Sequence, residues 1–560
     1  MWRNRVRARR TASLFVAAAA VFAGGARAQQ HPRAPAAPPP TPVAAPVAPA
    51  LPPITVAPPS AAEASGQPLS LVEAVQTALR LHPIIATARA DLAARRADIG
   101  IARGQFDPVG TASLTHDHSY SYLGPAQRSA PGERAALTDT SDFTVGASAA
   151  TRFGMQITPT VGWSRIHSRP AGITIPGLPT DPYSQAHVGI ALVQHLLRGA
   201  GTVGAASAVE SATRSARAAE HTVAFTAQQQ ALAAARAYFQ LVAARDQLAL
   251  QRDGEASIRK VVEETRILVA ADQRPRSDLH QLEGYLATRT RSVIEAQDAY
   301  VQAAYALRSA MGLSADTSPL WAPTDPFPES HPITVQRDAL IRLAQTRRSD
   351  VSAARAAVAA TEAGLRGAEW NTKPQLDLSA STGYVGGTDK DGVGNFFAAI
   401  GQNVPGVNAG VGLSLELPFN NTAQLAARDS QRANYDRARI AAADVERTLP
   451  IDTLTAIEDV ELSAAALNAA TRSVRSLTDA LNDENDKMKS GVGTVIDMLF
   501  TEDRLITARV SMTADHLSYA LALTQLVFEI GGMPKDPAQA SQLLSELAAP
   551  GTTHGSQPAQ

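Results

Sequence analysis

Residues 202–268 constrain the fold more than any other part of the chain. This stretch is rich in alanine, has no proline and contains two glycines, Gly204 and Gly254. Its core-type positions recur every three or four residues, which is the period of one helix face. They are Leu232, Ala235, Phe239 and Val242 and, further along the stretch, Ile258, Val261, Thr265 and Leu268. The sequence predicts one continuous helix packed along its length, about 100 Å long at 1.5 Å per residue. A compact domain has no need of such a helix.

A second helix of the same kind follows a short turn that contains Pro275. Ser277 is a candidate N-cap for this helix, because its hydroxyl can accept a hydrogen bond from a free N–H group of the first turn. Apolar positions keep the same spacing up to Leu307, with Arg289 as the interruption. The two helices are expected to form a long antiparallel hairpin.

Between Pro108 and the long helix, the period changes from helical to alternating. Apolar and polar residues alternate in three segments, each with room for the roughly 9–11 residues of a membrane-crossing strand. The apolar members are Phe143, Val145 and Ala147, then Ile157, Val161 and Trp163, then Val188, Ile190 and Leu192. Polar loops at residues 123–140 and 168–183, with a tight turn at 152–154, give the asymmetry of an outer-membrane barrel.

The same pattern starts again 266 positions later, where Val351 matches Ile85 and Pro374 matches Pro108. Strands, with a glycine-rich loop at residues 383–410, precede a second pair of helices that turns at residues 490–493. The chain is therefore a tandem duplication, and its first copy carries an extra strand pair. We assign residues 68–320 to the first repeat, 321–332 to a linker, 333–535 to the second repeat and 536–560 to a C-terminal tail.

The first 67 residues are not expected to belong to either repeat. Residues 1–28 combine an arginine-rich start, an apolar run and the small-x-small site Ala26-Arg27-Ala28, which predicts a secretory signal peptide. Residues 29–67 are rich in proline and alanine, which predicts a disordered tether.

Composition excludes several classes of function. The 51 basic and 52 acidic residues give no basic excess, so we expect no nucleic-acid partner. The absence of cysteine excludes a disulfide framework, a thiolate metal site and a thiol nucleophile, and also a lipid-modified cysteine. The chain contains no HExxH, GxSxG or P-loop motif, so we expect it not to be an enzyme.

Two motifs resemble ligand sites but are interpreted differently. Residues 199–204 match G-x-G-x-x-G, yet the helix after them is too long for a dinucleotide-binding unit, and we interpret the glycines as a flexible join between strand and helix. His116 and His118 have a real metal-ligand spacing, but the sequence identifies no third ligand. We therefore expect neither a metal nor a cofactor.

The sharpest local signal lies at the turn of the second hairpin. Gly491, Val492 and Gly493 allow the chain to reverse, and Thr494 can cap the returning helix. Asp497 then lies in the first helical turn, where the helix dipole favours a carboxylate. The turn of the first hairpin carries the corresponding pair Ser277 and Asp278. Asp497 is either a charge that only stabilises its helix or, together with Asp278, part of a shared site at one end of the molecule.

These features together resemble the TolC-type outer-membrane efflux protein family. The segments that carry the resemblance extend over both copies: Leu-Ser-Leu-Val-Glu-Ala-Val at 69–75, Ala-Arg-Ala at 88–90, Leu-Leu-Arg-Gly-Ala-Gly at 196–201, Ser-Asp-Leu at 277–279, Pro-Gln-Leu at 374–376, and residues 491–499.

The resemblance implies an α+β membrane protein that forms a homotrimer. Its long helical hairpins would form an α-barrel across the periplasm, and its transmembrane strands would form one shared β-barrel in the outer membrane of a Gram-negative bacterium. The implied partners are a periplasmic adaptor protein and an inner-membrane pump, besides outer-membrane lipid. The implied adaptor contact is the tip formed by Gly491, Val492, Gly493, Thr494 and Ser277.

In the family, the aspartate after this turn lines the closed aperture, which corresponds here to Asp497. Asp278 is its counterpart in the first copy. Better-known members carry another aspartate three residues further on, where this chain has Phe500.

We hypothesise a passive exit duct of a tripartite efflux pump for small molecules. The alternatives are the duct of a type I protein secretion system, or a non-conducting periplasm-spanning coiled-coil scaffold or adhesin. The sequence does not separate the two ducts, because the pump selects the substrate.

Overall fold

The computed structural model describes residues 67–128, 131, 134–170, 182–314, 320–330, 336–390, 392–401, 407–490 and 492–548. The predicted signal peptide, nearly all of the predicted tether, the end of the C-terminal tail and Gly491 lie outside these ranges.

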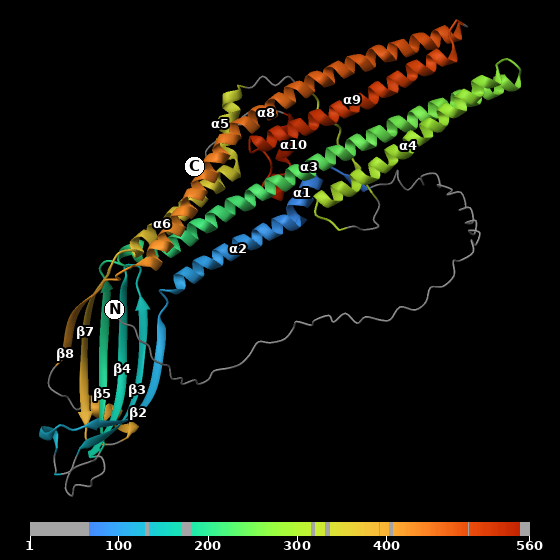
Figure 1. The fold of residues 1–560 in the computed structure, drawn as a ribbon. Coiled ribbons are helices and arrows are strands. Elements are labelled where there is room, and N and C mark those ends of the chain that lie inside the picture. The colour runs from blue at the N-terminus through green and yellow to red at the C-terminus, as the bar shows by residue number, and fades with distance from the viewer. Residues whose placement is uncertain are drawn as a thin grey trace, which may run out of the picture. The chain divides into compact units, whose positions relative to one another are not determined.

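The element order shows the duplication directly (Figure 1). The first copy contains β1 (Gln67–Leu69), α1 (Leu71–Leu81), α2 (Pro83–Gly104), β2 (Val109–Tyr122), β3 (Ala135–Ala150), β4 (Met155–Pro170), β5 (Tyr183–His195), α3 (Gly201–Ala270) and α4 (Arg276–Ala310). After β6 (Trp321–Pro323), the second copy contains α5 (Arg337–Arg347), α6 (Ser349–Asn371), β7 (Gln375–Thr388), α7 (Phe396–Gly401), β8 (Asn408–Glu416), α8 (Thr422–Lys489) and α9 (Val495–Glu529), and α10 (Gln542–Ala548) follows. Short 3₁₀ turns occupy Pro125–Gln127, Val393–Asn395 and Pro537–Gln539.

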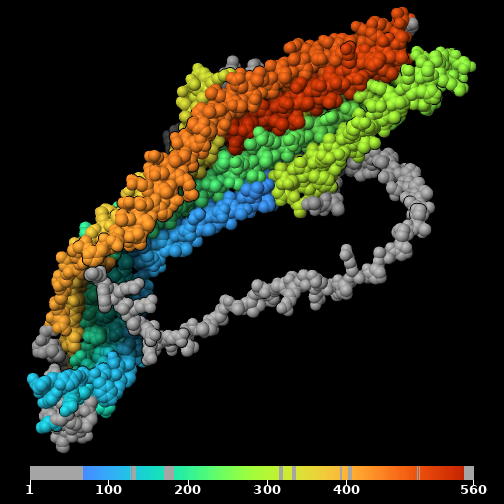
Figure 2. Space-filling view, viewed as in Figure 1, coloured from blue at the N-terminus to red at the C-terminus, as the bar shows by residue number. Residues whose placement is uncertain are grey.

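The predicted long helix is confirmed as α3, which has 70 residues and would extend over about 105 Å at the standard rise. Its predicted seam is buried at Ala235, Phe239, Val242 and Ile258. Helices α6, α4, α2, α9 and α1 pack against it. The second hairpin, α8 and α9, lies along the first one (Figure 2).

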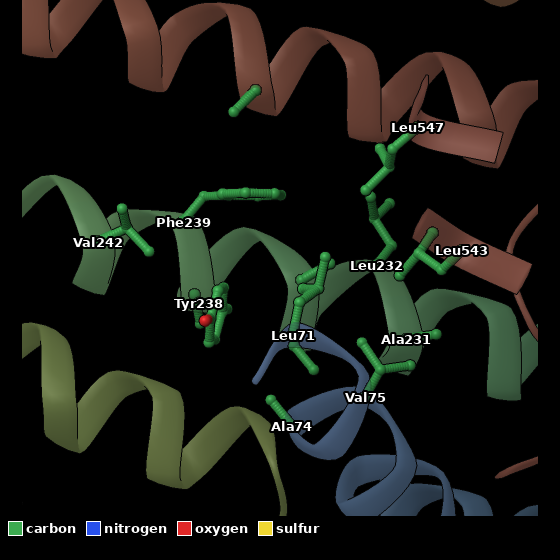
Figure 3. Close-up of a cluster of buried hydrophobic side chains, with 14 of the residues drawn as sticks. Leu71, Ala74, Val75, Ala231, Leu232, Tyr238, Phe239, Val242, Leu543 and Leu547 are labelled. Carbon is green, nitrogen blue, oxygen red and sulfur yellow. The ribbon is translucent and has the colours of Figure 1, made fainter. Parts of the chain in front are cut away.

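The best-buried part of the helical region surrounds Tyr238 of α3 (Figure 3). The Tyr238 hydroxyl donates to the carbonyl of Leu69 over 3.1 Å and contacts a carboxylate oxygen of Asp325 at 2.9 Å. The same carboxylate accepts the backbone N–H of Leu71 at 2.6 Å. Strands β1 and β6 pair in parallel beside this cluster. The beginning of the first copy is therefore fixed to the segment that joins the two copies.

Helix α1 begins as its sequence predicts. Ser70 is its N-cap, and Ser70 and Glu73 form a reciprocal capping box. The helix buries Leu71, Val75 and Leu79 and ends before Pro83, which opens α2.

The strands of the described residues form one antiparallel six-stranded sheet in the order β2-β3-β4-β5-β7-β8, besides the short β1–β6 pair. Four of its strands come from the first copy and two from the second, which confirms the extra strand pair. The predicted loops at 123–140, 168–183 and 383–410 were too long. Strand β3 already begins at Ala135, β4 continues to Pro170 and β7 continues to Thr388. Polar and glycine residues extend these strands because ladder hydrogen bonds join backbone groups and need no apolar side chain.

Helix α7 lies inside the third of those loops, and it was not predicted. It packs on β5 and β7, where the Tyr384 hydroxyl donates to the carbonyl of Ile400 at 2.9 Å. No helix among the described residues is both long enough and apolar enough to cross a membrane.

The glycines at 199–204 lie where β5 leads into α3. Gly199 and Gly201 have positive φ angles of 81° and 64°. A Cβ on Gly204 would lie 2.8 Å from the Trp370 ring, whose Nε1 donates to the carbonyl of Leu197. These glycines therefore permit a sharp turn and close packing between strand and helix.

Candidate functional site: the hairpin tips

The tip of the second hairpin is closed by hydrogen bonds between its own residues. Two backbone N–H groups, of Val492 and Gly493, donate to the carbonyl of Lys487 at 3.0 and 3.1 Å. A Cβ on Gly493 would lie 3.0 Å from the backbone nitrogen of Met488, so any larger residue would crowd this reversal. The predicted residue Gly491 lies outside the described residues.

Thr494 caps α9, as predicted. Its hydroxyl oxygen accepts the backbone N–H of Asp497 at 3.2 Å and donates to the Asp497 carboxylate at 2.6 Å. Asp497 itself is exposed, as are Val492 and Phe500. Asp497 thus stabilises the first turn of α9 and also presents its charge to solvent at the tip.

The tip of the first hairpin differs from the prediction at Ser277. The N-cap lies two residues earlier than predicted, at Pro275, so helix α4 begins at Arg276 and has no side-chain capping bond. Pro275 fixes its own φ at −67° and helical geometry starts directly after it, so Ser277 lies inside the first turn. Its hydroxyl donates to Asp278 at 3.3 Å instead.

A cavity of about 350 Å³ brings the two tips together. Arg274 and Asp278 of the first tip form an ion pair of 3.8 Å on its wall, and Gly493 and Thr494 of the second tip complete it. Ser277, Val492 and Asp497 are not among its lining residues. Its surroundings are apolar and include Ile258, Val262, Leu282, Val495 and Leu499. The cavity thus joins Asp278 of the first tip to Thr494 of the second, whereas Asp497, the predicted counterpart of Asp278, does not line it.

Sequence reasoning missed a polar cluster that joins the two hairpins. Arg289 of α4 is only 8% exposed, and its guanidinium pairs with the carboxylate of Asp503 on α9. The Tyr285 hydroxyl accepts from Arg289 at 2.6 Å and donates to Asp503 at 3.1 Å. Burial raises the pKa of Tyr285. The interruption of the apolar pattern at Arg289 was the available signal, but its partner is 214 positions away.

The sheet has an apolar face and a polar face. From the end nearer the helices up to the row of Leu114, Phe143 and Trp163, cross-strand partners place the alternating apolar residues on one side and hydroxyl, amide and imidazole groups on the other. The apolar face contains Ala112, Leu114, Phe143, Val145, Val161, Trp163, Val188, Ile190, Ala380, Val411 and Leu413. The polar face contains Thr111, Ser113, Thr144, Thr160, Gln185, His187, Ser379, Ser381 and Ser414.

The polar face continues into the helical region. His195, at the end of β5 on this face, lines a cavity of about 980 Å³ together with Asp98 of α2, Ser211 of α3, Gly364 of α6 and Gln431 of α8. The wall of this cavity therefore extends from the sheet onto four helices, and it mixes polar side chains with alanine and glycine.

His116 and His118 point to the same face of β2, but they bond to different partners. His116 contacts the Ser141 hydroxyl at 2.9 Å, and His118 contacts the Asp139 carboxylate. Over the part of the chain that the structure describes, no group of three or more metal-ligating side chains is placed to hold an ion.

Comparison with known proteins identifies the family. The family described as "Outer membrane efflux protein" matches residues 74–313 and 340–532. The outer membrane protein TolC of Vibrio cholerae is 26% identical over 332 residues, which cover 58% of this chain and 72% of TolC.

Two solved structures share the fold. The CmeC outer membrane channel of Campylobacter jejuni aligns with a TM-score of 0.58 and 14% identity, covering 85% of this chain and 89% of CmeC. The open state of the MtrE outer membrane channel of Neisseria gonorrhoeae aligns with a TM-score of 0.55 and 18% identity, covering 83% of this chain and 90% of MtrE. The family consists of channel proteins from the outer membranes of Gram-negative bacteria. The chain belongs to the outer membrane efflux protein family and is an outer-membrane protein.

Proposed function

We propose that three copies of this chain form the outer-membrane exit duct of a tripartite efflux pump, through which small molecules leave the periplasm passively. The observation that carries the proposal is the polar face of the sheet together with the cavity that continues from its end onto α2, α3, α6 and α8. A membrane-crossing sheet turns its apolar face to lipid, so its polar face lines the lumen. The helices then extend the same lumen away from the membrane.

The sheet edges support the trimer. Within the described residues, β2 and β8 each pair with a single neighbour, and all their side chains are exposed. Unpaired edges within a membrane are costly, since lipid offers no hydrogen bonds. Joining β8 of one copy to β2 of the next closes eighteen strands, three times six. Barrels of 16–18 strands leave an aqueous channel.

The hairpin tips would form the periplasmic end of the duct. A three-fold ring of Asp497 would repel itself, attract cations and line the aperture. Asp278 would contribute from the first hairpin, where it lines the cavity between the tips. Gly491, Val492, Gly493, Thr494 and Ser277 would contact the hairpins of a periplasmic adaptor, and the inner-membrane pump would supply the energy.

The test is electrical. The full chain is purified from outer membranes, checked for a heat-modifiable trimer and inserted into a planar bilayer. Stepwise conductance supports the duct, while an inserted trimer without conductance would support the scaffold or adhesin. Co-purification of a small-molecule pump supports efflux, whereas co-purification of a protein-exporting ATPase would favour type I secretion.

A further inference from the structure

Helix α7 lies on the sheet, and the proposed duct gives it no role. It packs on β5 and β7. One hydrogen bond shows which face of the sheet it covers, because the Tyr384 hydroxyl donates to the carbonyl of Ile400 in α7 at 2.9 Å. Tyr384 is the cross-strand partner of Val188, which belongs to the apolar face. Helix α7 therefore lies on the apolar face and not on the polar face.

The sheet is shaped to receive this helix. Next to Val188 on the same face, Ser184 and Ala186 of β5 are both 0% exposed. Gly386 of β7, the partner of Ala186, is also buried. On the helix itself, Ala399 is 0% exposed. Small residues let the helix backbone approach the strands closely, and a glycine inside a strand often marks such an approach.

The other side of α7 is apolar and uncovered. The helix has the sequence Phe-Phe-Ala-Ala-Ile-Gly, which contains no charged, amide or hydroxyl side chain. Phe397 is 80% exposed, and its ring meets the ring of Phe396 edge to face at 5.2 Å. Ala398 beside it is exposed as well. The helix thus adds an outward apolar surface to a face of the sheet that is already apolar.

Helix α7 also lies at a particular level of the sheet. Strand β5 leads into α3 after His195, so its other end, at Tyr183, is the end away from the helical region. From His195 to Ala186 the strand has about ten residues, the length that a membrane-crossing strand needs. The apolar face ends at this level, where Ala186 lies opposite Trp163. Helix α7 covers the same level and therefore marks the outer edge of the apolar face.

The backbone of α7 is adapted to an apolar medium. The last four carbonyls of a helix have no partner within it, and an unsatisfied carbonyl is costly where lipid replaces water. Tyr384 supplies a partner to one of them, at Ile400. The polar part of the loop lies elsewhere, since Asp389 and Lys390, which follow β7, are exposed before the chain returns to the sheet as α7.

We propose that α7 is an interfacial helix that inserts Phe397 among the acyl chains of the outer leaflet and holds the outer end of the sheet at the membrane surface. The proposal rests on the proposed position of the sheet across the outer membrane. Helices that lie at this boundary bury their apolar side chains just below the headgroups. Tyr120 and Tyr122 of β2 are exposed beyond the same level, and aromatic residues at such a level are typical of membrane barrels.

The experiment uses the absence of cysteine from the chain, because a single introduced cysteine then carries a nitroxide label without background. F397C is compared with V145C, at the centre of the apolar face, and with D389C, in the polar part of the loop. All three replace exposed side chains. Each full-length trimer is reconstituted in phospholipid bilayers. Electron paramagnetic resonance then measures collisions of the label with oxygen, which concentrates in the hydrocarbon, and with a water-soluble nickel chelate.

The label at F397C should collide more often with oxygen than with the nickel chelate, as the label at V145C should, while D389C should show the reverse. A label at F397C that is as accessible to the nickel chelate as the label at D389C would overturn the proposal, because α7 would then lie in water. A label shielded from both reagents would also overturn it and would indicate that a second copy of the chain covers α7.

V145C separates this proposal from the duct. A label at V145C that meets the nickel chelate would mean that the sheet does not cross the membrane, and both proposals would fail. A trimer that conducts, with V145C in lipid and F397C in water, would refute the role of α7 alone. A trimer with both labels in lipid and no conductance would refute the duct and support the interfacial helix.

Discussion

Asp503→Ala removes the carboxylate that joins α9 of the second hairpin to Arg289 of the first. Arg289 would keep the Tyr285 hydroxyl at 2.6 Å and the Tyr285 ring, whose centroid lies 5.0 Å from its guanidinium carbon. Its charge, however, would stay in a site where the residue is 8% exposed. The Asp503 side chain is 49% exposed, so solvent screens part of the attraction. We therefore expect a cost of about 2 kcal/mol, within the range for a charge-assisted hydrogen bond.

A change of about 2 kcal/mol alters the equilibrium between packed and parted tips by roughly 30-fold. Amide hydrogen exchange of the first turns of α9 on the intact protein should accelerate by about this factor, and the mean conductance in a planar bilayer should rise. The matched control is Glu295→Ala on the same helix as Arg289. It removes an exposed ion pair of 2.9 Å with Arg291. The free energy of opening measured by hydrogen exchange should change by less than about 0.5 kcal/mol.

The double variant R289M/D503A adds a further check. It removes the buried charge together with its partner, so much of the lost protection should return. Unchanged exchange in Asp503→Ala, or a change no larger than that of Glu295→Ala, would refute the idea that this contact holds the hairpins together.

Three further perturbations test other parts of the molecule. Asp497→Ala should change single-channel conductance and weaken block by divalent cations, because the ring of carboxylates is lost; unaltered block would exclude this ring from the aperture. Burial lowers the pKa of His516, which is stacked on Phe327, so its contribution to stability is complete above about pH 6.5 and is lost as the pH falls. His516→Phe should therefore reduce the fall in melting temperature between pH 7.5 and pH 5, and an identical fall in both proteins would contradict this. Tyr238→Phe should lower the melting temperature by the equivalent of about 1–3 kcal/mol, because Asp325 loses a buried hydroxyl partner. Burial raises the pKa of Tyr238 to about 12, so Tyr238 should contribute little tyrosinate absorbance at pH 11. The wild type and Tyr238→Phe should therefore show the same tyrosinate absorbance at that pH.

Local periodicity was sufficient to predict the helices. The three–four spacing predicted α3 to within two residues at each end, because an apolar seam repeats wherever a helix packs along its length. Alternation similarly predicted the central parts of β3, β4 and β5. It did not predict how far β3 extends toward Ala135 or β4 toward Pro170, since those ends carry polar side chains.

The contacts between the copies could not be predicted locally. Arg289 and Asp503 meet only because the two hairpins pack side by side. In the sequence, Arg289 looks like an interruption of an apolar pattern, and Asp503 looks like a surface charge. Helix α7 was also missed, because six residues within a glycine-rich loop give no helical period. At the tips, the sequence predicted Asp278 with Asp497 at an aperture and Thr494 in an adaptor contact, and both remain predictions. It also assigned a cap to Ser277 that Pro275 makes unnecessary.

The central claim is that three copies enclose one continuous aqueous path, and single-channel recording of the purified full-length trimer in a planar bilayer tests it most directly. The account predicts stepwise, cation-preferring conductance that Asp497→Ala alters. Trimers that are inserted in the bilayer, as shown by their heat-modifiable band, but that give no conductance steps would contradict it.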